Sequence, residues 1–360
     1  MLYYTSKNKR ALWADVLLLL TAGIWGFGFV AQRSGMEYVG PFAFNGIRFL
    51  LGSLSLLPLI VWRSQRSRRS RQNGLNQGKT ARAGKKPGFR DIKNPAMASF
   101  LAGTCLFIAV TLQQVGIMFT TAGNAGFITG LYVVLTPIFG IFLGRKTGPA
   151  TWVGAFFTLT GLYFISAAGH LDAINPGDAI TAVSAVFWAF HVLLIDRLVR
   201  NTDPIVLSSG QFAVCGVYSL AAALGIESFL GGWVEALAPG LSASGLFAWK
   251  PFPALAAGLS SGGIPLSSVS NAVIPLLYGG LASVGIAYTL QTVAQREAPP
   301  AHATIILCLE GCFAALGGVL LLSEPLGPWT VLGFVLMFAG MLVSQWEVIG
   351  PRKAADQKHR

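Results

Sequence analysis

The sequence predicts an all-α integral membrane protein whose ten transmembrane helices form two inverted repeats of five helices each. Only 11% of the 360 residues are charged and 53% are hydrophobic, whereas about a quarter of the residues of an ordinary soluble domain are charged. The hydrophobic residues fall in segments long enough to cross a hydrocarbon core of about 30 Å. In addition, the second half of the chain repeats residue patterns of the first half.

Ten apolar segments have the length of a membrane span. They are residues 11–32, 40–62, 96–119, 122–144, 149–168, 177–199, 204–226, 271–294, 300–322 and 328–346. A signal peptide would also lie at the first segment, but this segment is long, and no small-residue cleavage site precedes a polar mature start. Two long linkers interrupt the series, a basic one at 63–95 and a Gly/Ser-rich one at 227–270.

Lysine and arginine are distributed unevenly between the two sides that this topology defines. If the N-terminus lies inside, the inner segments hold 23 of the 26 basic residues, and linker 63–95 alone holds 11. Because cytoplasmic loops carry the excess of basic residues, both termini are expected in the cytoplasm. The net charge of +12 then belongs to solvated inner loops, which argues against nucleic-acid binding. Contact of loop 63–95 with anionic lipid is an alternative role for these charges.

Several residue patterns recur in the same order in the two halves. The pattern D-x9-W-x-F begins at Asp15 and again at Asp178, and Thr-Leu-Gln occurs at 111–113 and again at 289–291. Each copy has five spans, an odd number, so the second copy must be inverted in the membrane. We therefore expect one repeat at 11–168, with the cytoplasmic loop 63–95, and a second at 177–346, with the external loop 227–270. Inverted repeats are typical of secondary transporters whose substrate site lies near the membrane midplane.

With these patterns the chain resembles the EamA-type ten-helix branch of the drug/metabolite transporter superfamily. The resemblance covers nearly all of residues 11–346. Besides the duplicated unit, it is carried by Gly-Phe-Ile-Thr-Gly-Leu-Tyr at 126–132, by the ninth-span acid Glu310 and by Ser-Glu-Pro-Leu-Gly at 323–327. The resemblance implies a carrier of the inner or plasma membrane, often an exporter of amino acids or other small metabolites, with a central cavity between the halves.

The chain departs from the pattern of that family in three places. Gly311 follows the ninth-span acid, where the family usually has proline, and Lys146 stands where an acid usually precedes the fifth span. The external linker 227–270 is also unusually long. These departures concern the choice of substrate rather than the fold.

Two charged residues inside the spans are candidate substrate-binding residues. Glu310 lies in the ninth span, where a carboxylate costs on the order of 2.5–3.5 kcal/mol on insertion scales. It could carry a proton, pair with a cationic substrate, or tie two helices together; its counterpart in the first half is Tyr132, a further candidate. Arg48, in the second span, could bind a carboxylate by two hydrogen bonds or pair with Glu310.

The remaining candidates are uncharged side chains at membrane depth. The aromatic and imidazole groups could form a cavity wall or a packed helix face, and the amides could contact a zwitterion or join helices. These residues are Trp25, Trp188, His191, Gln113, Asn124 and Gln291.

The sequence thus predicts a secondary transporter that exports a small organic metabolite, an amino acid or similar compound, by alternating access, with protons as a possible coupling ion. The alternatives are a membrane enzyme acting on a lipid-linked substrate, with Glu310 and His191 as acid and base, or a carrier of nucleotide sugars or sugar phosphates. No enzyme activity, cofactor or metal is expected. Gly-x-Ser-x-Gly at 258–262 lies in a loop, and Cys308 and Cys312 are read as packing residues. The sequence indicates no oligomeric state.

Overall fold

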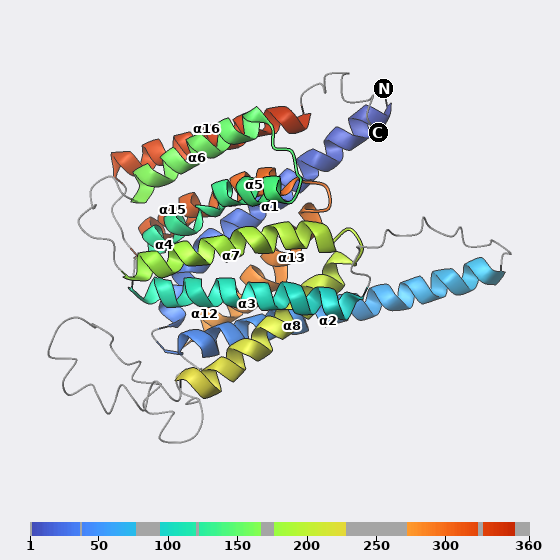
Figure 1. Ribbon diagram of the computed structural model, residues 1–360. Coiled ribbons are helices and arrows are strands. Elements are labelled where there is room, and N and C mark those ends of the chain that lie inside the picture. The colour runs from blue at the N-terminus through green and yellow to red at the C-terminus, as the bar shows by residue number, and fades with distance from the viewer. Residues whose placement is uncertain are drawn as a thin grey trace.

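The computed structural model describes residues 2–36, 38–76, 94–119, 122–166, 176–227, 272–322 and 327–349, and these residues form a helical bundle without strands (Figure 1). Seven helical runs among them are long and apolar enough to cross a membrane. Large apolar side chains such as Phe142, Leu224 and Ile274 are exposed on the surface of the bundle. An extended apolar surface of this kind is expected where a protein faces lipid.

The first half of the chain contains six helices. They are α1 (Leu2–Gly35), α2 (Pro41–Asn76), α3 (Pro95–Phe119), α4 (Ala122–Thr129), α5 (Tyr132–Phe142) and α6 (Pro149–Ser166). Three of them begin at a proline, whose fixed φ suits the first helical turn and whose missing N–H would have no partner there.

The second half of the chain contains seven α-helices and two π-helical segments among its described residues. Its α-helices are α7 (Pro176–Leu198), α8 (Pro204–Ala222), α12 (Val273–Leu277), α13 (Thr289–Ala294), α14 (Pro300–Leu307), α15 (Glu310–Leu322) and α16 (Pro328–Ile349). Two π-helical segments, η1 (Ala223–Glu227) and η3 (Tyr278–Tyr288), extend α8 and connect α12 to α13. The expected span 271–294 is therefore one apolar run built of three helical pieces.

The predicted start of the basic linker is wrong. We expected residues 63–95 to be a loop, but α2 continues to Asn76 and projects from the bundle as a long helix (Figure 1). Between positions 63 and 73 the sequence has no glycine or proline and is rich in arginine and glutamine, which are good helix formers. Residues 77–93 of this linker, and 228–271 of the external linker, lie outside the described residues.

Two expected spans are interrupted at equivalent positions. α4 ends at Thr129 and α5 begins at Tyr132, while α14 ends at Leu307 and α15 begins at Glu310. At both interruptions the backbone makes a hydrogen bond between residues three positions apart, as in a 3₁₀ turn. The Leu131 N–H donates to the Ile128 carbonyl, and the Leu309 N–H donates to the Ile306 carbonyl. Each of the predicted spans 122–144 and 300–322 is therefore built of two helical pieces, and Pro300–Leu321 still has the length and composition of one membrane span. A break at membrane depth requires that the freed backbone groups be buried in protein or line a cavity.

The two breaks lie against each other. The Cys308 thiol is 3.4 Å from the carbonyl oxygen of Gly130, to which it donates. The Tyr132 hydroxyl is 3.4 Å from the Glu310 carboxylate. In both contacts the partners are 178 positions apart, the same offset that separates the repeated Thr-Leu-Gln patterns. The breaks thus place corresponding residues of the two halves in contact at the centre of the bundle.

Repeated glycines allow α6 and α16 to approach closely, and Figure 1 shows the two helices side by side. A Cβ atom added at Gly340 would lie 2.6 Å from the carbonyl oxygen of Gly154, and one added at Gly161 would lie 2.6 Å from that of Gly333. Helix pairs in lipid associate through close packing of small residues because the hydrophobic effect does not drive them together. The repeated glycines are therefore positions of direct backbone contact.

We predict that Gly340→Ala destabilises the protein, because the new methyl group would meet the backbone of α6 and force the two helices apart. Overpacking of this kind typically costs about 1–3 kcal/mol. Thermal unfolding of the detergent-solubilised protein measures the effect. Gly225→Ala is the matched control, because no atom lies within 4 Å of its added Cβ; equal unfolding temperatures for the two variants would contradict the close contact.

Candidate functional site

A cavity of about 30 Å³ lies between α1, α2, α3, α7, η3, α13 and the two broken helices. A cavity of this volume has room for about one or two water molecules. Most of its wall is aromatic, amide or hydroxyl in character, with one acid and one base. Its lining residues are Trp25, Phe29, Gln32, Arg48, Gln113, Thr129, Tyr132, Trp188, Val192, Ser283, Tyr288, Gln291, Leu307 and Glu310.

Glu310 lies at the start of α15, directly after the break, and its side chain is only 5% exposed. Its carboxylate accepts a hydrogen bond of 3.4 Å from the Tyr132 hydroxyl. In the part of the chain that the structure describes, no basic side chain lies within 4.0 Å of it. Glu310 is thus an acid at the cavity wall that has a neutral partner, and the suggested ion pair with Arg48 is not formed.

Arg48 lies on α2 and is 2% exposed. Its Nε–H donates to the Asn45 side-chain oxygen at 2.9 Å, and its guanidinium lies 5.0 Å from the ring centre of Phe49 and 5.7 Å from that of Phe44. The terminal nitrogens have no hydrogen-bond partner among the described residues. The aromatic contacts stabilise the cation and leave its two terminal NH₂ groups available to an anionic group in the cavity.

Three aromatic side chains form one wall of the cavity. The ring centre of Tyr288 lies 4.5 Å from that of Trp25 and 6.0 Å from that of Trp188. The Trp25 indole N–H donates to the Ser283 carbonyl at 3.2 Å, which fixes the orientation of that ring. These rings come from α1, α7 and η3, so Trp25 and Trp188, which are 163 positions apart in the sequence, lie on one surface.

The duplicated Thr-Leu-Gln patterns bring two amides to the same cavity. Gln113, on α3, donates to the Thr129 hydroxyl at 3.0 Å. Among the described residues, Gln291, on α13, has a buried side-chain oxygen without a hydrogen-bond partner, and so has Gln32. The indole N–H of Trp188 is likewise unpartnered. A buried polar atom without a partner costs about 1–3 kcal/mol, so these atoms favour a ligand with both donors and acceptors.

Two of the residues proposed from the sequence are not among the lining residues. The His191 ring is fully buried behind the wall, where its Nε2 is 2.9 Å from the Gln211 side-chain oxygen and its ring packs edge-on against Trp188. The Asn124 side chain lies outside the described residues. The other seven, from Trp25 to Glu310, all line the cavity.

Several lining residues are absent from the predictions made on sequence alone. Phe29 and Gln32 follow Trp25 at spacings of four and seven, and Val192 follows Trp188 at a spacing of four. Helical periodicity puts such residues on one face, so following the helix faces of Trp25 and Trp188 would have found them. Tyr288 precedes the second Thr-Leu-Gln pattern, but its counterpart, offset by 178 positions, is a valine and gives no signal.

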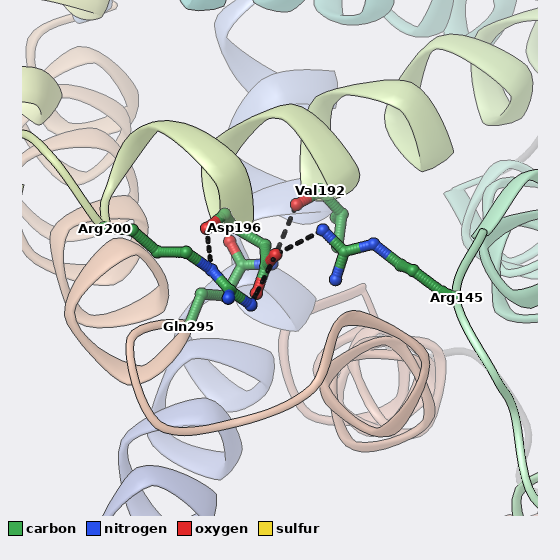
Figure 2. A network of polar contacts seen from close by, with 5 residues as sticks. All are labelled: Arg145, Val192, Asp196, Arg200 and Gln295. Carbon is green, nitrogen blue, oxygen red and sulfur yellow. Dashed lines mark hydrogen bonds and ion pairs between the residues drawn. The ribbon is translucent and has the colours of Figure 1, made fainter. Parts of the chain in front are cut away.

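A polar network lies at the end of α7, close to the cavity wall (Figure 2). Asp196 is almost fully buried and accepts hydrogen bonds from Arg145 at 2.5 Å and from Arg200 at 3.2 Å. One turn earlier, the carbonyl of Val192, a lining residue, accepts a hydrogen bond of 3.2 Å from Gln295. Arg145 and Asp196 thus connect the segment between α5 and α6 with α7. Beside them, Gln295 connects the end of α13 with α7.

We predict that Arg145→Ala destabilises the protein more than Arg63→Ala does. Removing Arg145 leaves the buried Asp196 carboxylate with only the largely exposed Arg200, and losing a charged hydrogen-bond partner costs about 1.5–3 kcal/mol. Arg63 pairs with Asp203 at 3.6 Å, and both side chains are about half exposed, so its loss should cost at most about 1 kcal/mol. Denaturant or thermal unfolding in detergent compares the two, and equal losses would contradict the buried network.

The sequence model of the EamA-like transporter family matches residues 12–167 and 251–345 of the chain. An "uncharacterized transporter" of Archaeoglobus fulgidus is 27% identical over 94% of this chain and 88% of its own length. The "uncharacterized inner membrane transporter YedA" of Escherichia coli is 24% identical over 92% of this chain and 90% of its own length.

One solved structure has a fold similar to that of this chain. A crystal structure that is 16% identical in sequence superposes with a TM-score of 0.62, over 93% of this chain and 96% of the other chain. At this identity the likeness concerns the fold alone.

Proposed function

The chain belongs to the EamA-like transporter family, a family of multi-pass membrane proteins, and from this premise we propose that it is a secondary transporter of a small organic metabolite. We further propose that it exports an amino acid or similar zwitterion from the cytoplasm by alternating access, in the inner or plasma membrane. The observation that carries the proposal is that Arg48 and Glu310 line one cavity without pairing with each other.

The proposed architecture is ten spans in two inverted repeats, residues 11–168 and 177–346. The helix contacts support it, because close pairs occur in matching sets. α3 packs on α7 as η3 and α13 pack on α1, and α4 packs on α15 as α14 packs on α5. The contact of Gly154 with Gly340 likewise corresponds to that of Gly333 with Gly161. A two-fold relation between the halves accounts for all these pairs.

We place both termini in the cytoplasm. The distribution of lysine and arginine supports this orientation. The beginning of α1 and the end of α16 also lie at the same end of the bundle in Figure 1. Arg145, Asp196 and Arg200 would then lie at the cytoplasmic end, where the network joins residues of both repeats and would act as a closed inner gate.

The chemistry of the cavity supports a zwitterionic substrate. The terminal NH₂ groups of Arg48 suit a carboxylate, and the Glu310 carboxylate suits an ammonium group. The unpartnered oxygens of Gln32 and Gln291 add acceptors for the ammonium hydrogens. Trp25 and Tyr288 would contact an apolar side chain. Discontinuous helices near the midplane commonly carry such sites in secondary transporters.

The two alternatives find less support. An enzyme using Glu310 and His191 as acid and base would need both groups at the substrate, but only Glu310 lines the cavity, while His191 is bonded to Gln211. A carrier of nucleotide sugars or sugar phosphates would need several cations for the phosphate groups, and Arg48 is the one basic residue in the described lining.

We predict that Arg48→Gln weakens the binding of amino acids by about 10- to 100-fold, because a charge-assisted hydrogen bond contributes about 1.5–3 kcal/mol. A thermal-shift screen of the purified protein against amino acids measures the binding, since a ligand of the folded state raises its apparent stability. Amines that lack the carboxylate should bind wild type and Arg48→Gln alike. Arg63→Gln, at an exposed pair outside the cavity, is the control. Equal affinities of wild type and Arg48→Gln for amino acids would overturn the zwitterion proposal.

Proton coupling through Glu310 is a separate part of the proposal. If the carboxylate exchanges a proton during each cycle, a pH gradient should drive transport in wild-type vesicles and should lose its effect in Glu310→Gln, which cannot ionise. Transport of the amino acid identified by the screen is measured with and without the gradient. Gradient dependence that persists in Glu310→Gln would show that another group carries the proton.

A further inference from the structure

Positive charge is concentrated in α2 at the point where this helix leaves the bundle. Five arginines stand within nine residues, and no aspartate or glutamate occurs between positions 38 and 90. These arginines, here called the arginine segment, are Arg63, Arg66, Arg68, Arg69 and Arg71. α2 is helical through all five positions and projects from the bundle at the end where α1 begins and α16 ends (Figure 1).

Trp62 marks the end of the apolar part of α2. From Phe49 to Trp62 the sequence contains no charged residue, and Trp62 is about half exposed. Tryptophan is enriched where a membrane helix meets the lipid headgroups. The guanidinium of Arg66, one turn further on, lies 5.4 Å from the ring centre of Trp62. We therefore expect the headgroup layer to begin at Trp62 and to include Arg66.

The whole arginine segment lies within electrostatic reach of this layer. Arg71 is nine positions after Trp62, which is roughly 14 Å along a helix at 1.5 Å per residue. The headgroups add about 5–7 Å to each side of the hydrocarbon core, and charges act over about 8 Å more at physiological ionic strength. Each arginine position is thus inside the headgroup layer or within one screening length of it.

The five positions are distributed around the whole circumference of the helix. At 3.6 residues per turn they fall at roughly 0°, 80°, 140°, 240° and 300° about the helix axis. A helix that lies flat on a membrane has its polar and apolar residues on opposite faces, and a helix that docks in a groove uses one face. A helix that crosses the headgroup layer is surrounded by phosphates instead. The distribution favours this last arrangement.

One carboxylate lies beside the arginine segment. Arg63 pairs with Asp203 at 3.6 Å, and both side chains are about half exposed. Asp203 also accepts hydrogen bonds from the backbone N–H groups of Ile205 and Val206 at the start of α8. A single carboxylate balances one of five cations, so a partner with several negative charges suits the segment.

We propose that Trp62 and the arginine segment form a binding surface for the headgroups of anionic phospholipids. Trp62 holds the helix at the boundary of the hydrocarbon, and the arginines bind the surrounding phosphates through charge-assisted hydrogen bonds. Each arginine near an anionic membrane surface contributes about fivefold to binding. In the orientation proposed above the surface lies in the cytoplasmic leaflet, which is rich in anionic lipid. The surface itself depends on neither the substrate nor the direction of transport.

A thermal-shift titration of the purified full-length protein in a neutral detergent tests the surface, because a ligand of the folded state raises the apparent stability. The probe is phosphatidylglycerol, and phosphatidylcholine with the same acyl chains is the reference. We expect phosphatidylglycerol to bind at least tenfold more tightly, and this preference to shrink as salt is raised from about 0.05 M to 1 M, where screening is stronger. Equal affinities for the two lipids overturn the proposal.

A fourfold variant locates the binding. Replacing Arg66, Arg68, Arg69 and Arg71 together by glutamine should weaken phosphatidylglycerol binding by about 10- to 100-fold and leave phosphatidylcholine binding unchanged. Arg63 is kept because it pairs with Asp203. Replacing the same four arginines by lysine should restore most of the binding, since the charge is retained. If the glutamine variant does not fold, the double variant Arg68→Gln/Arg69→Gln replaces it, with an expected loss of at least fivefold.

The matched control removes the same amount of charge from the same linker. Lys79, Arg82, Lys85 and Arg90 replaced together by glutamine should keep most of the affinity for phosphatidylglycerol. Equal losses in the two fourfold variants would show that net charge alone attracts the lipid, and would overturn the proposal. The proposal is also overturned if free glycerol phosphate competes as well as the lipid does, or if a single-stranded RNA binds the segment more tightly. Since no transport is measured, failure of the proposed function would produce none of these results.

Discussion

The hydrocarbon interior of a membrane offers no partner to a backbone N–H or carbonyl group, and this constraint governs where the helices of this protein can be broken. The helical runs of α4 and α5 and of α14 and α15 are both interrupted, and each interruption lies against the other. The thiol of Cys308 donates to the carbonyl of Gly130. The same place is occupied by the cavity, which provides a polar surrounding for the remaining groups.

The cavity combines an acidic and a basic side chain in a setting where isolated charges are costly. Arg48 rests on the rings of Phe44 and Phe49, and Glu310 is bonded to a tyrosine hydroxyl. The two side chains do not pair with each other, although both are buried. A structural ion pair would have satisfied the two residues at once, so their separation is the feature that most favours a ligand with complementary charges.

The ionisable groups away from the cavity are arranged differently. Asp196 is shared by two arginines at one end of α7, and Asp15 is bonded to His302 between three helices. In both places a buried carboxylate joins segments that belong to different proposed repeats. Opening the bundle where Asp196 and Asp15 lie would require these contacts to break. The glycine contacts between α6 and α16 could persist, with the two helices moving as one packed pair.

The sequence alone determined the class of the protein and the duplicated pattern, and it pointed to seven of the fourteen residues that line the cavity, because hydrophobic length, Lys/Arg distribution and repeated residues are local properties. It did not reveal the breaks at Gly130 and Cys308, since neither position is marked by proline. The tertiary structure decided which face each residue presents: it placed His191 behind the wall, brought Tyr288 into it and kept Arg48 apart from Glu310. These outcomes depend on how helices distant in the sequence pack together, and spacing along a single helix carries no information about its partner.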